Sequence, residues 1–128
     1  MAQHPPVYAK LLADKMAKHE ARCVMLNTGW CGGAYGVGKR ISIKDTRSLL
    51  NAALRGDLHA KSMQYTTHPV FGMKVPTSCP GVDPKVLNPR SLWQDGAAYD
   101  AAATQLRDMF RKNFEDKKFG ALGLEQVM

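Results

Sequence analysis

The segment from Gly29 to Gly38 contains five glycines in ten residues, and it limits the regular structure that this part of the chain can form. Glycine adopts positive φ angles without steric cost and weakens the interior of helices and strands. The segment therefore predicts a loop with unusual backbone angles, or one that another group approaches closely. Gly33 and Gly38-Lys39 stand at the spacing of a phosphate-binding loop, but Arg40 replaces the Ser or Thr of that pattern.

This departure argues against a true phosphate-binding loop. Such a loop joins a strand directly to a helix, and its hydroxyl holds Mg²⁺. Here Ser42 and Asp45 form a capping-box pattern, so the next helix is expected to start only at that point. Two interpretations remain open from the residues alone: an ordinary structural loop, or an anion or nucleotide contact through Lys39, Arg40 and a glycine nest.

Composition narrows the class of protein. The chain has 128 residues and is expected to form a single domain over 1–128. No apolar run approaches the ~18 residues of a membrane span, and no secretory signal is visible, so a cytoplasmic protein without a membrane partner is expected. Three cysteines and four histidines lie at spacings that suit no metal site, so no metal ligand is predicted.

The formal charge is +7, which allows three interpretations. The basic residues can form a solvated surface, bind an anionic ligand such as a nucleotide, or bind nucleic acid. They are spread along the chain, and no nucleic-acid-binding module is recognisable. We therefore expect no nucleic-acid partner and keep a basic nucleic-acid binder only as the weakest hypothesis.

The first half of the chain predicts a helix, a strand, the glycine loop and a second helix. Pro5-Pro6 begins a helix that fades near His19-Glu20. The apolar run 23–26 is predicted to be a buried strand. The second helix should run from Lys44 to about Leu54 and end at Gly56, with an apolar face formed by Ile43, Leu50 and Leu54.

The second half predicts two short strands and a final helix. The strands are expected over 62–66 and 70–75, broken near His68-Pro69. Prolines then favour an ordered loop or extended arm over 76–89. Asp95 caps a last helix, on one face of which lie Tyr99, Ala103, Leu106, Phe110 and Phe114. With a loose tail over 120–128, the fold class is mixed α/β.

Several motifs occur in one order along the chain: Asn27-Thr28-Gly29-Trp30, then GVGKRISIKDTR over 36–47, VPTSCPGV over 75–82 and LNPR over 87–90. Together with HPPVYAKLL over 4–12, this series resembles the C-terminal part of the ATP-dependent phosphoenolpyruvate carboxykinase family. The resemblance covers nearly the whole chain, and its most specific block is 27–47.

The resemblance implies part of the C-terminal nucleotide-binding domain of the carboxykinase fold. The family is a lyase of gluconeogenesis that converts oxaloacetate and ATP into phosphoenolpyruvate, CO₂ and ADP, with Mg²⁺ and Mn²⁺. Its nucleotide contacts carry over to Arg40, Ile41 and Thr46. An arginine can pair with phosphate or stack on a purine, and the backbone of Ile41 and the hydroxyl of Thr46 can bond a base edge. The plainer alternatives are a core Ile41 and a capping or solvent-facing Thr46.

The family's phosphate-binding loop, metal ligands and oxaloacetate-binding arginines have no counterpart here. We therefore expect no catalytic residue and no metal ligand in this segment, no activity of the chain alone, and weak affinity for ATP. One hypothesis is an excised or truncated C-terminal piece of the enzyme, with Met1 an artificial or misassigned start. The other is a stand-alone, non-catalytic paralogue that binds a nucleotide or a partner. Surface that met the rest of the enzyme would favour self-association.

Overall fold

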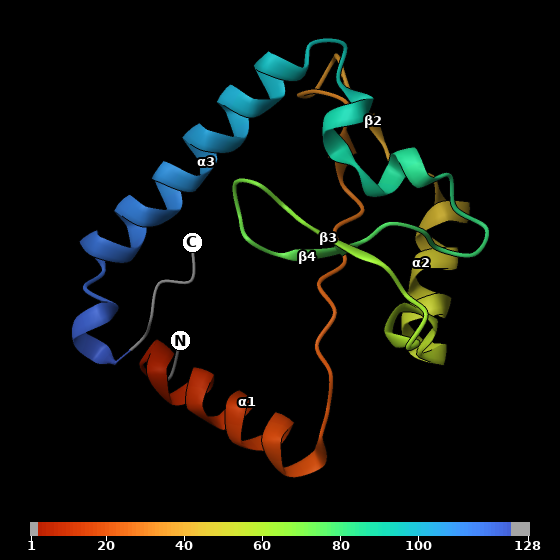
Figure 1. Cartoon of the computed structure of the whole chain (residues 1–128). Helices are drawn as coiled ribbons and strands as arrows, with labels where there is room; N and C mark the ends of the chain where they lie inside the picture. The colour runs from red at the N-terminus through yellow and green to blue at the C-terminus, as the bar shows by residue number, and fades with distance from the viewer. Residues whose placement is uncertain (1–2, 124–128) are drawn as a thin grey trace.

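The computed structural model describes residues 3–123, which form helices and two small antiparallel sheets in an open arrangement (Figure 1). The α-helices are α1 (Pro5–His19), α2 (Ile43–Arg55) and α3 (Gly96–Asp116). The sheets are the hairpins β1 (Trp30–Cys31) with β2 (Lys39–Arg40) and β3 (Tyr65–Thr67) with β4 (Lys74–Pro76). This mixture of helices and small sheets confirms the mixed α/β prediction at that level. The predicted tail 120–128 is described only to Gly123, with a 3₁₀ turn at Gly120–Leu122, and the remainder lies outside the described residues.

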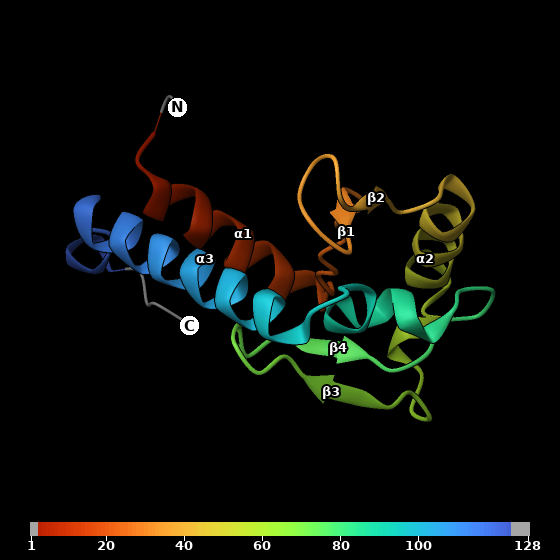
Figure 2. The same ribbon diagram turned by 90° about the horizontal axis from the view of Figure 1, so that it is seen from above.

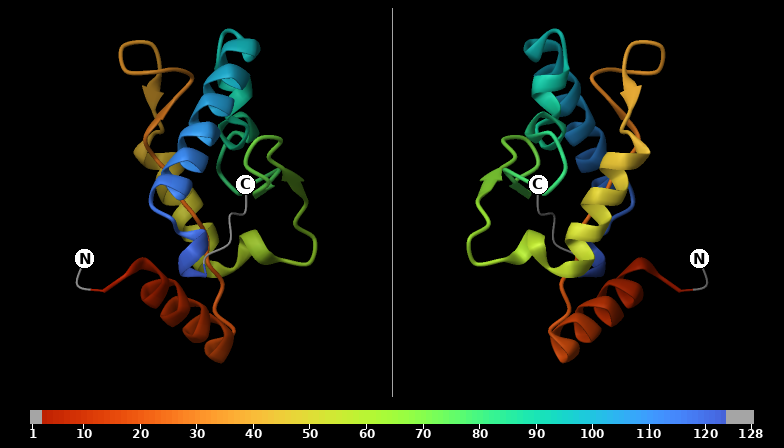
Figure 3. Two further views of the ribbon diagram at one scale, coloured as in Figure 1. Left: turned by 90° about the vertical axis from the view of Figure 1, so that its left-hand side faces the viewer. Right: turned by 90° about the vertical axis from the view of Figure 1, so that its right-hand side faces the viewer.

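Helix α1 begins and ends as predicted but contributes nothing to a core. Its first turn holds Pro5 and Pro6, and it ends at Glu20, whose φ of 50° is left-handed. Helix α1 lies apart from α2 and from both hairpins (Figures 1 and 3), and it contains no buried residue. Two of its apolar side chains, Leu11 and Leu12, are more than half exposed.

The buried strand predicted over 23–26 is wrong. No strand forms there, and Met25 is 79% exposed. The segment between α1 and β1 crosses the molecule as an extended chain (Figure 1). A strand requires a neighbour to accept its backbone hydrogen bonds, and the described part of the chain offers none beside it.

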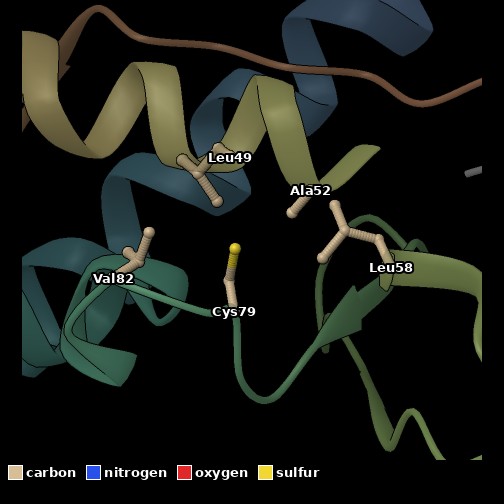
Figure 4. Packing of buried hydrophobic residues seen from close by; sticks show 5 residues of the cluster. All are labelled: Leu49, Ala52, Leu58, Cys79 and Val82. Atoms are coloured by element: carbon tan, nitrogen blue, oxygen red, sulfur yellow. The ribbon is translucent and has the colours of Figure 1, made fainter. Parts of the chain in front are cut away.

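Helix α2 contributes two of the five residues of the small core. Ser42 caps it, with its hydroxyl accepting from the N–H of Asp45 at 3.0 Å, and Gly56 ends it at a φ of 84°. Both caps confirm the prediction. The core joins two residues of α2 to the 3₁₀ turn Asp57–His59 and the chain around position 80 (Figure 4); its members are Leu49, Ala52, Leu58, Cys79 and Val82.

The prediction of which face of α2 is buried was wrong. Leu49 and Ala52 are buried, whereas Leu50 is 46% exposed and Ile43 and Leu54 are more than 70% exposed. Helical spacing places Ile43, Leu50 and Leu54 together on one stripe. The spacing does not show which stripe another segment of the chain covers. The segment of the Cys79–Val82 β-bridge packs on the stripe that contains Leu49 and Ala52.

The glycine segment folds as the turn of the β1–β2 hairpin. In its antiparallel register, Trp30 is opposite Arg40 and Cys31 is opposite Lys39. The N–H groups of Val37 and Gly38 both donate to the carbonyl of Ala34, at 3.0 and 2.8 Å. The predicted unusual backbone angles are confirmed, since Gly32, Gly33 and Gly36 all have positive φ.

The β3–β4 hairpin lies between α2 and the start of α3 (Figures 1 and 2). Thr66 is opposite Val75, and the strands are shorter than the predicted ranges of 62–66 and 70–75. The proline segment is an irregular arm as predicted, but it also contains two 3₁₀ turns, Pro84–Leu87 and Pro89–Leu92, each with proline in its first turn.

Helix α3 starts at Asp95 as predicted, with the carboxylate accepting from the N–H of Ala97 at 2.8 Å. Arg90 crosses from the second 3₁₀ turn and donates to both oxygens of Asp100, at 2.9 and 3.0 Å. This ion pair attaches the first turns of α3 to the second 3₁₀ turn, and Ala103 is buried. Further along, Leu106 and Phe110 remain exposed.

His68 connects the turn of the β3–β4 hairpin to α3. Its Nδ1 accepts from the N–H groups of Val70 and Phe71, both at 3.2 Å, and its Nε2 lies 2.8 Å from the hydroxyl of Tyr99. Because Nδ1 accepts, the proton of the neutral ring is on Nε2. Burial lowers the pKa of His68, which also favours the neutral ring.

Over residues 3–123, no helix combines the length and apolar character needed to cross a bilayer.

The first prediction concerns Gly38, where the hairpin closes most tightly. A Cβ built there would lie 2.6 Å from the carbonyl oxygen of Cys31 and closer still to that of Gly33. Both are backbone atoms, so Gly38→Ala should force the strands apart. The amide of Ile41, which donates to Gly29 at 3.2 Å, should then exchange with solvent much faster, as measured by NMR hydrogen exchange.

Gly36→Ala is the matched control. No atom lies within 4 Å of its added Cβ, and only its φ of 88° is unfavourable. It should cost about 1–2 kcal/mol locally and leave the strands paired. Equal exchange rates of the Ile41 amide in the two variants would contradict the close approach at Gly38.

The second prediction concerns acid pH. The pKa of His68 is lower in the folded chain than its unfolded value of about 6.5, so the unfolded state binds more protons. The stabilisation should be complete above that pH and decline as the pH falls through the folded pKa. Thermal unfolding of the wild-type chain should show this loss, and His68→Gln should reduce it. The exposed His19→Gln is the control, and an unchanged pH dependence in His68→Gln would refute the assignment.

Candidate functional site

The three residues predicted to contact a nucleotide lie close together in the chain, around the junction of β2 and α2. Arg40 is the last residue of β2, Ile41 follows it, and Thr46 lies in the first turn of α2. Between them, Ser42 caps the helix. The hairpin pairing and the cap thus hold both ends of the stretch that contains all three residues.

Arg40 is exposed, and its guanidinium lies over an aromatic ring. Its Cζ atom is 5.6 Å from the centroid of the Trp30 indole, within the range of a cation–π contact. Trp30 in turn meets the Tyr35 ring edge-to-face, at 5.3 Å between centroids and 83° between planes. Arg40 can therefore offer a delocalised cation to a phosphate or to the face of a purine.

Ile41 and Thr46 are half-buried, and their backbone N–H groups are already used. The N–H of Ile41 donates to Gly29 at 3.2 Å, and that of Thr46 donates to Ser42 at 2.9 Å. A contact from the Ile41 backbone would therefore come from its carbonyl oxygen, and one from Thr46 would come from its hydroxyl. Ile41 lies outside the buried cluster, and Ser42 rather than Thr46 caps the helix.

The glycine segment differs from a phosphate-binding loop in its connections. It joins two paired strands instead of a strand and a helix, and Lys39 lies within β2. Two of its N–H groups, those of Val37 and Gly38, point inward to Ala34 and are not available to cradle an anion. The structure therefore favours side-chain contacts from Arg40 over a glycine nest.

The donor set near the hairpin does not fit a divalent cation. The neighbouring charged groups include Lys39, Arg40 and Lys44, while the carboxylate of Asp45 accepts from the Ser42 hydroxyl at 2.7 Å. In the described residues, His, Cys, Asp and Glu form no group of three that could hold a metal ion. Mg²⁺ binds oxygen ligands, so no metal-dependent step is assigned to these residues.

A cavity of about 480 Å³ lies elsewhere, between β3–β4, the 3₁₀ turns and the start of α3. It contains none of the predicted site residues. Two polar groups on its wall are bonded to neighbours, His68 to Tyr99 and Arg90 to Asp100.

Trp30 and Tyr35 received no role from the sequence, although the structure places both beside Arg40. The sequence signal that was missed is the placement of Trp30 and Arg40 on either side of the glycine turn. Predicting a hairpin there would have made them cross-strand neighbours.

Comparison with known proteins identifies the family. The family model described as phosphoenolpyruvate carboxykinase matches residues 1–85. A relative named phosphoenolpyruvate carboxykinase (ATP) from Geotalea uraniireducens is 56% identical over 92% of this chain and 22% of its own length. Proteins of the same name from Geobacter metallireducens and Cereibacter sphaeroides are 48% identical over 100% of the chain and 54% identical over 89%.

These alignments include 22%, 24% and 21% of the three relatives, so the chain spans about a fifth to a quarter of their length. The family model covers well over half of the chain. The chain therefore belongs to the phosphoenolpyruvate carboxykinase family.

Proposed function

We propose that this chain is the C-terminal portion of an ATP-dependent phosphoenolpyruvate carboxykinase and supplies nucleotide contacts to it. The observation that carries the proposal is the arrangement of Arg40, Ile41 and Thr46 around the junction of β2 and α2, in a chain 56% identical to such an enzyme. The reaction of the whole protein would convert oxaloacetate and ATP into phosphoenolpyruvate, CO₂ and ADP. Its setting would be gluconeogenesis in the cytoplasm.

Each of the three residues would contact the nucleotide through a different chemical group. The guanidinium of Arg40 would stack on the purine or pair with a phosphate. The carbonyl of Ile41 would accept from the exocyclic amino group of adenine, and the hydroxyl of Thr46 would bond a ring nitrogen. None of the three side chains would transfer a proton or a phosphoryl group, so their role would be to bind and orient the nucleotide. The segment thus forms one part of the nucleotide-binding domain and contributes no catalytic residue.

Activity of the chain by itself is not expected. Phosphoryl transfer depends on a phosphate cradle, cations and metal ions placed around the transferred group. In the described chain, the glycine turn closes on itself, and no carboxylate or histidine cluster is suited to Mg²⁺ or Mn²⁺. The oxaloacetate site and the metal ligands would come from the remaining three quarters or more of the enzyme.

The exposed surface supports a chain that works in contact with more protein. Its accessible area is 9891 Å². A compact monomer of 14.1 kDa exposes about 6,700 Å². Uncovered apolar faces occur on every α-helix; they include Leu11 and Leu12 on α1, Leu50 and Leu54 on α2, and Met109 and Phe110 on α3. A stand-alone paralogue would be expected to seal such faces, or to cover them by self-association.

The third prediction tests the nucleotide contact. In the 128-residue chain, ATP should bind weakly, and Arg40→Ala should reduce the affinity about tenfold or more, the effect of losing about 1.5–3 kcal/mol of charged hydrogen bonding. Arg55→Ala, at the other end of α2, removes the same charge and should change little. ATP-observed NMR measures affinities in this weak range. Equal loss in both variants would indicate only a general attraction to the basic surface.

Two further measurements test the larger proposal. The chain should convert no oxaloacetate with ATP and Mn²⁺, and measurable turnover would contradict inactivity. An antibody raised against it should detect a polypeptide several times larger than 14.1 kDa in cell extract. A native band near 14.1 kDa would instead support the non-catalytic paralogue.

A further inference from the structure

Trp30 is held directly against Arg40 by the pairing of β1 and β2. The two residues are opposite each other in the antiparallel register, so their side chains emerge on the same face of the hairpin. The guanidinium carbon lies 5.6 Å from the indole centroid. No salt bridge within the described range of the chain includes Arg40, whereas Arg90 and Arg107 are each paired with an aspartate.

Trp30, which is itself 45% exposed, also contacts a second aromatic ring. Tyr35, in the glycine turn, meets the indole edge-to-face. The positive φ angles of Gly33 and Gly36, on either side of Tyr35, are backbone states that residues with a Cβ rarely adopt. The turn, the tyrosine and the tryptophan thus form a continuous support that ends at the guanidinium.

We propose that Trp30 is a positioning residue for Arg40, whose guanidinium it holds against the indole so that the opposite face is open to the purine ring of the nucleotide. This inference rests on the proposed function, because it requires Arg40 to contact the nucleotide. A free arginine side chain on the surface samples many rotamers and must lose that freedom on binding. An arginine already held by an aromatic ring loses less, so the contact with Trp30 increases affinity without touching the ligand.

A solely structural role for Trp30 predicts different behaviour. Cross-strand pairs stabilise hairpins, and a tryptophan that did only this would affect ATP binding through the stability of the β1–β2 pairing. Its removal would then weaken binding whether or not Arg40 were present. A positioning role makes the effect of Trp30 depend on Arg40.

The fourth prediction is a double-mutant cycle on the 128-residue chain, with ATP affinity measured by ATP-observed NMR. Trp30→Leu should weaken binding about two- to fivefold, the strength of a cation–π contact at an exposed site. Trp30→Phe should retain part of that affinity, because phenylalanine keeps an aromatic face. In the Arg40→Ala background, Trp30→Leu should have no further effect.

A spectroscopic signal provides a second measurement. The chain contains two tryptophans, so Trp93→Phe leaves Trp30 as the only one. Its emission should change on addition of ATP along the same curve as the NMR titration. The reciprocal Trp30→Phe chain reports Trp93, whose ring packs on Tyr99 and not on Arg40, and its emission should change much less. A silent Trp30 in a chain that binds ATP would overturn the proposal.

The outcomes separate this proposal from the function on which it rests. If Arg40→Ala leaves ATP affinity unchanged, the proposed function fails. If Arg40→Ala weakens binding but Trp30→Leu does not, only the positioning role fails. Equal weakening by Trp30→Leu with and without Arg40 also overturns it. Exchange of the Ile41 amide shows whether the hairpin remains closed in Trp30→Leu, and a closed hairpin with reduced affinity supports the positioning role.

Discussion

The packing of α2 on the chain around Cys79 and Val82 is the contact on which the middle of the molecule depends. Leu49 and Ala52 enter this cluster from the helix, and Leu58 closes it from the turn that follows (Figure 4). Two residues separate the end of β2 from the start of α2, so fixing the helix also restricts the position of Arg40. Close packing resists displacement, so this small cluster limits how far the start of α2 beside the candidate site can move.

The same cluster is too small to organise the whole chain. Six hydrophobic residues of the described chain are buried, and five of them belong to it. Helix α1 and the outer half of α3 find no cover, although their patterns of apolar residues are those of helices that pack on something. Their exposure agrees with a chain that matches about a fifth to a quarter of its relatives' length.

Local signals in the sequence predicted local structure well. Pro5-Pro6, Ser42, Gly56 and Asp95 each marked a helix end that the structure contains, because caps satisfy backbone groups within a few residues. Signals that depend on a distant neighbour were less informative. The run 23–26 has the composition of a buried strand, but no described strand pairs with it. Spacing identified an apolar stripe on α2, yet the stripe that is covered is its neighbour.

The candidate site also combines features that local sequence predicts with features that depend on distant contacts. The order Arg40-Ile41-Ser42 and the cap at the start of α2 follow from residues that are adjacent in the chain, so the sequence by itself determined that Arg40, Ile41 and Thr46 lie close together around the start of α2. It also indicated a loop in the glycine segment, although Trp30–Cys31 near its start form β1. The family relationship is likewise contained in the order of its motifs.

Only the tertiary structure decided how these residues are held. Pairing of β1 with β2 places Trp30 against Arg40, and His68 meets Tyr99 across 31 positions of the sequence. These contacts depend on strand register and on how separate elements dock. The free energies that select a register or a docked face come from groups far apart in the chain, so no short stretch of sequence specifies them.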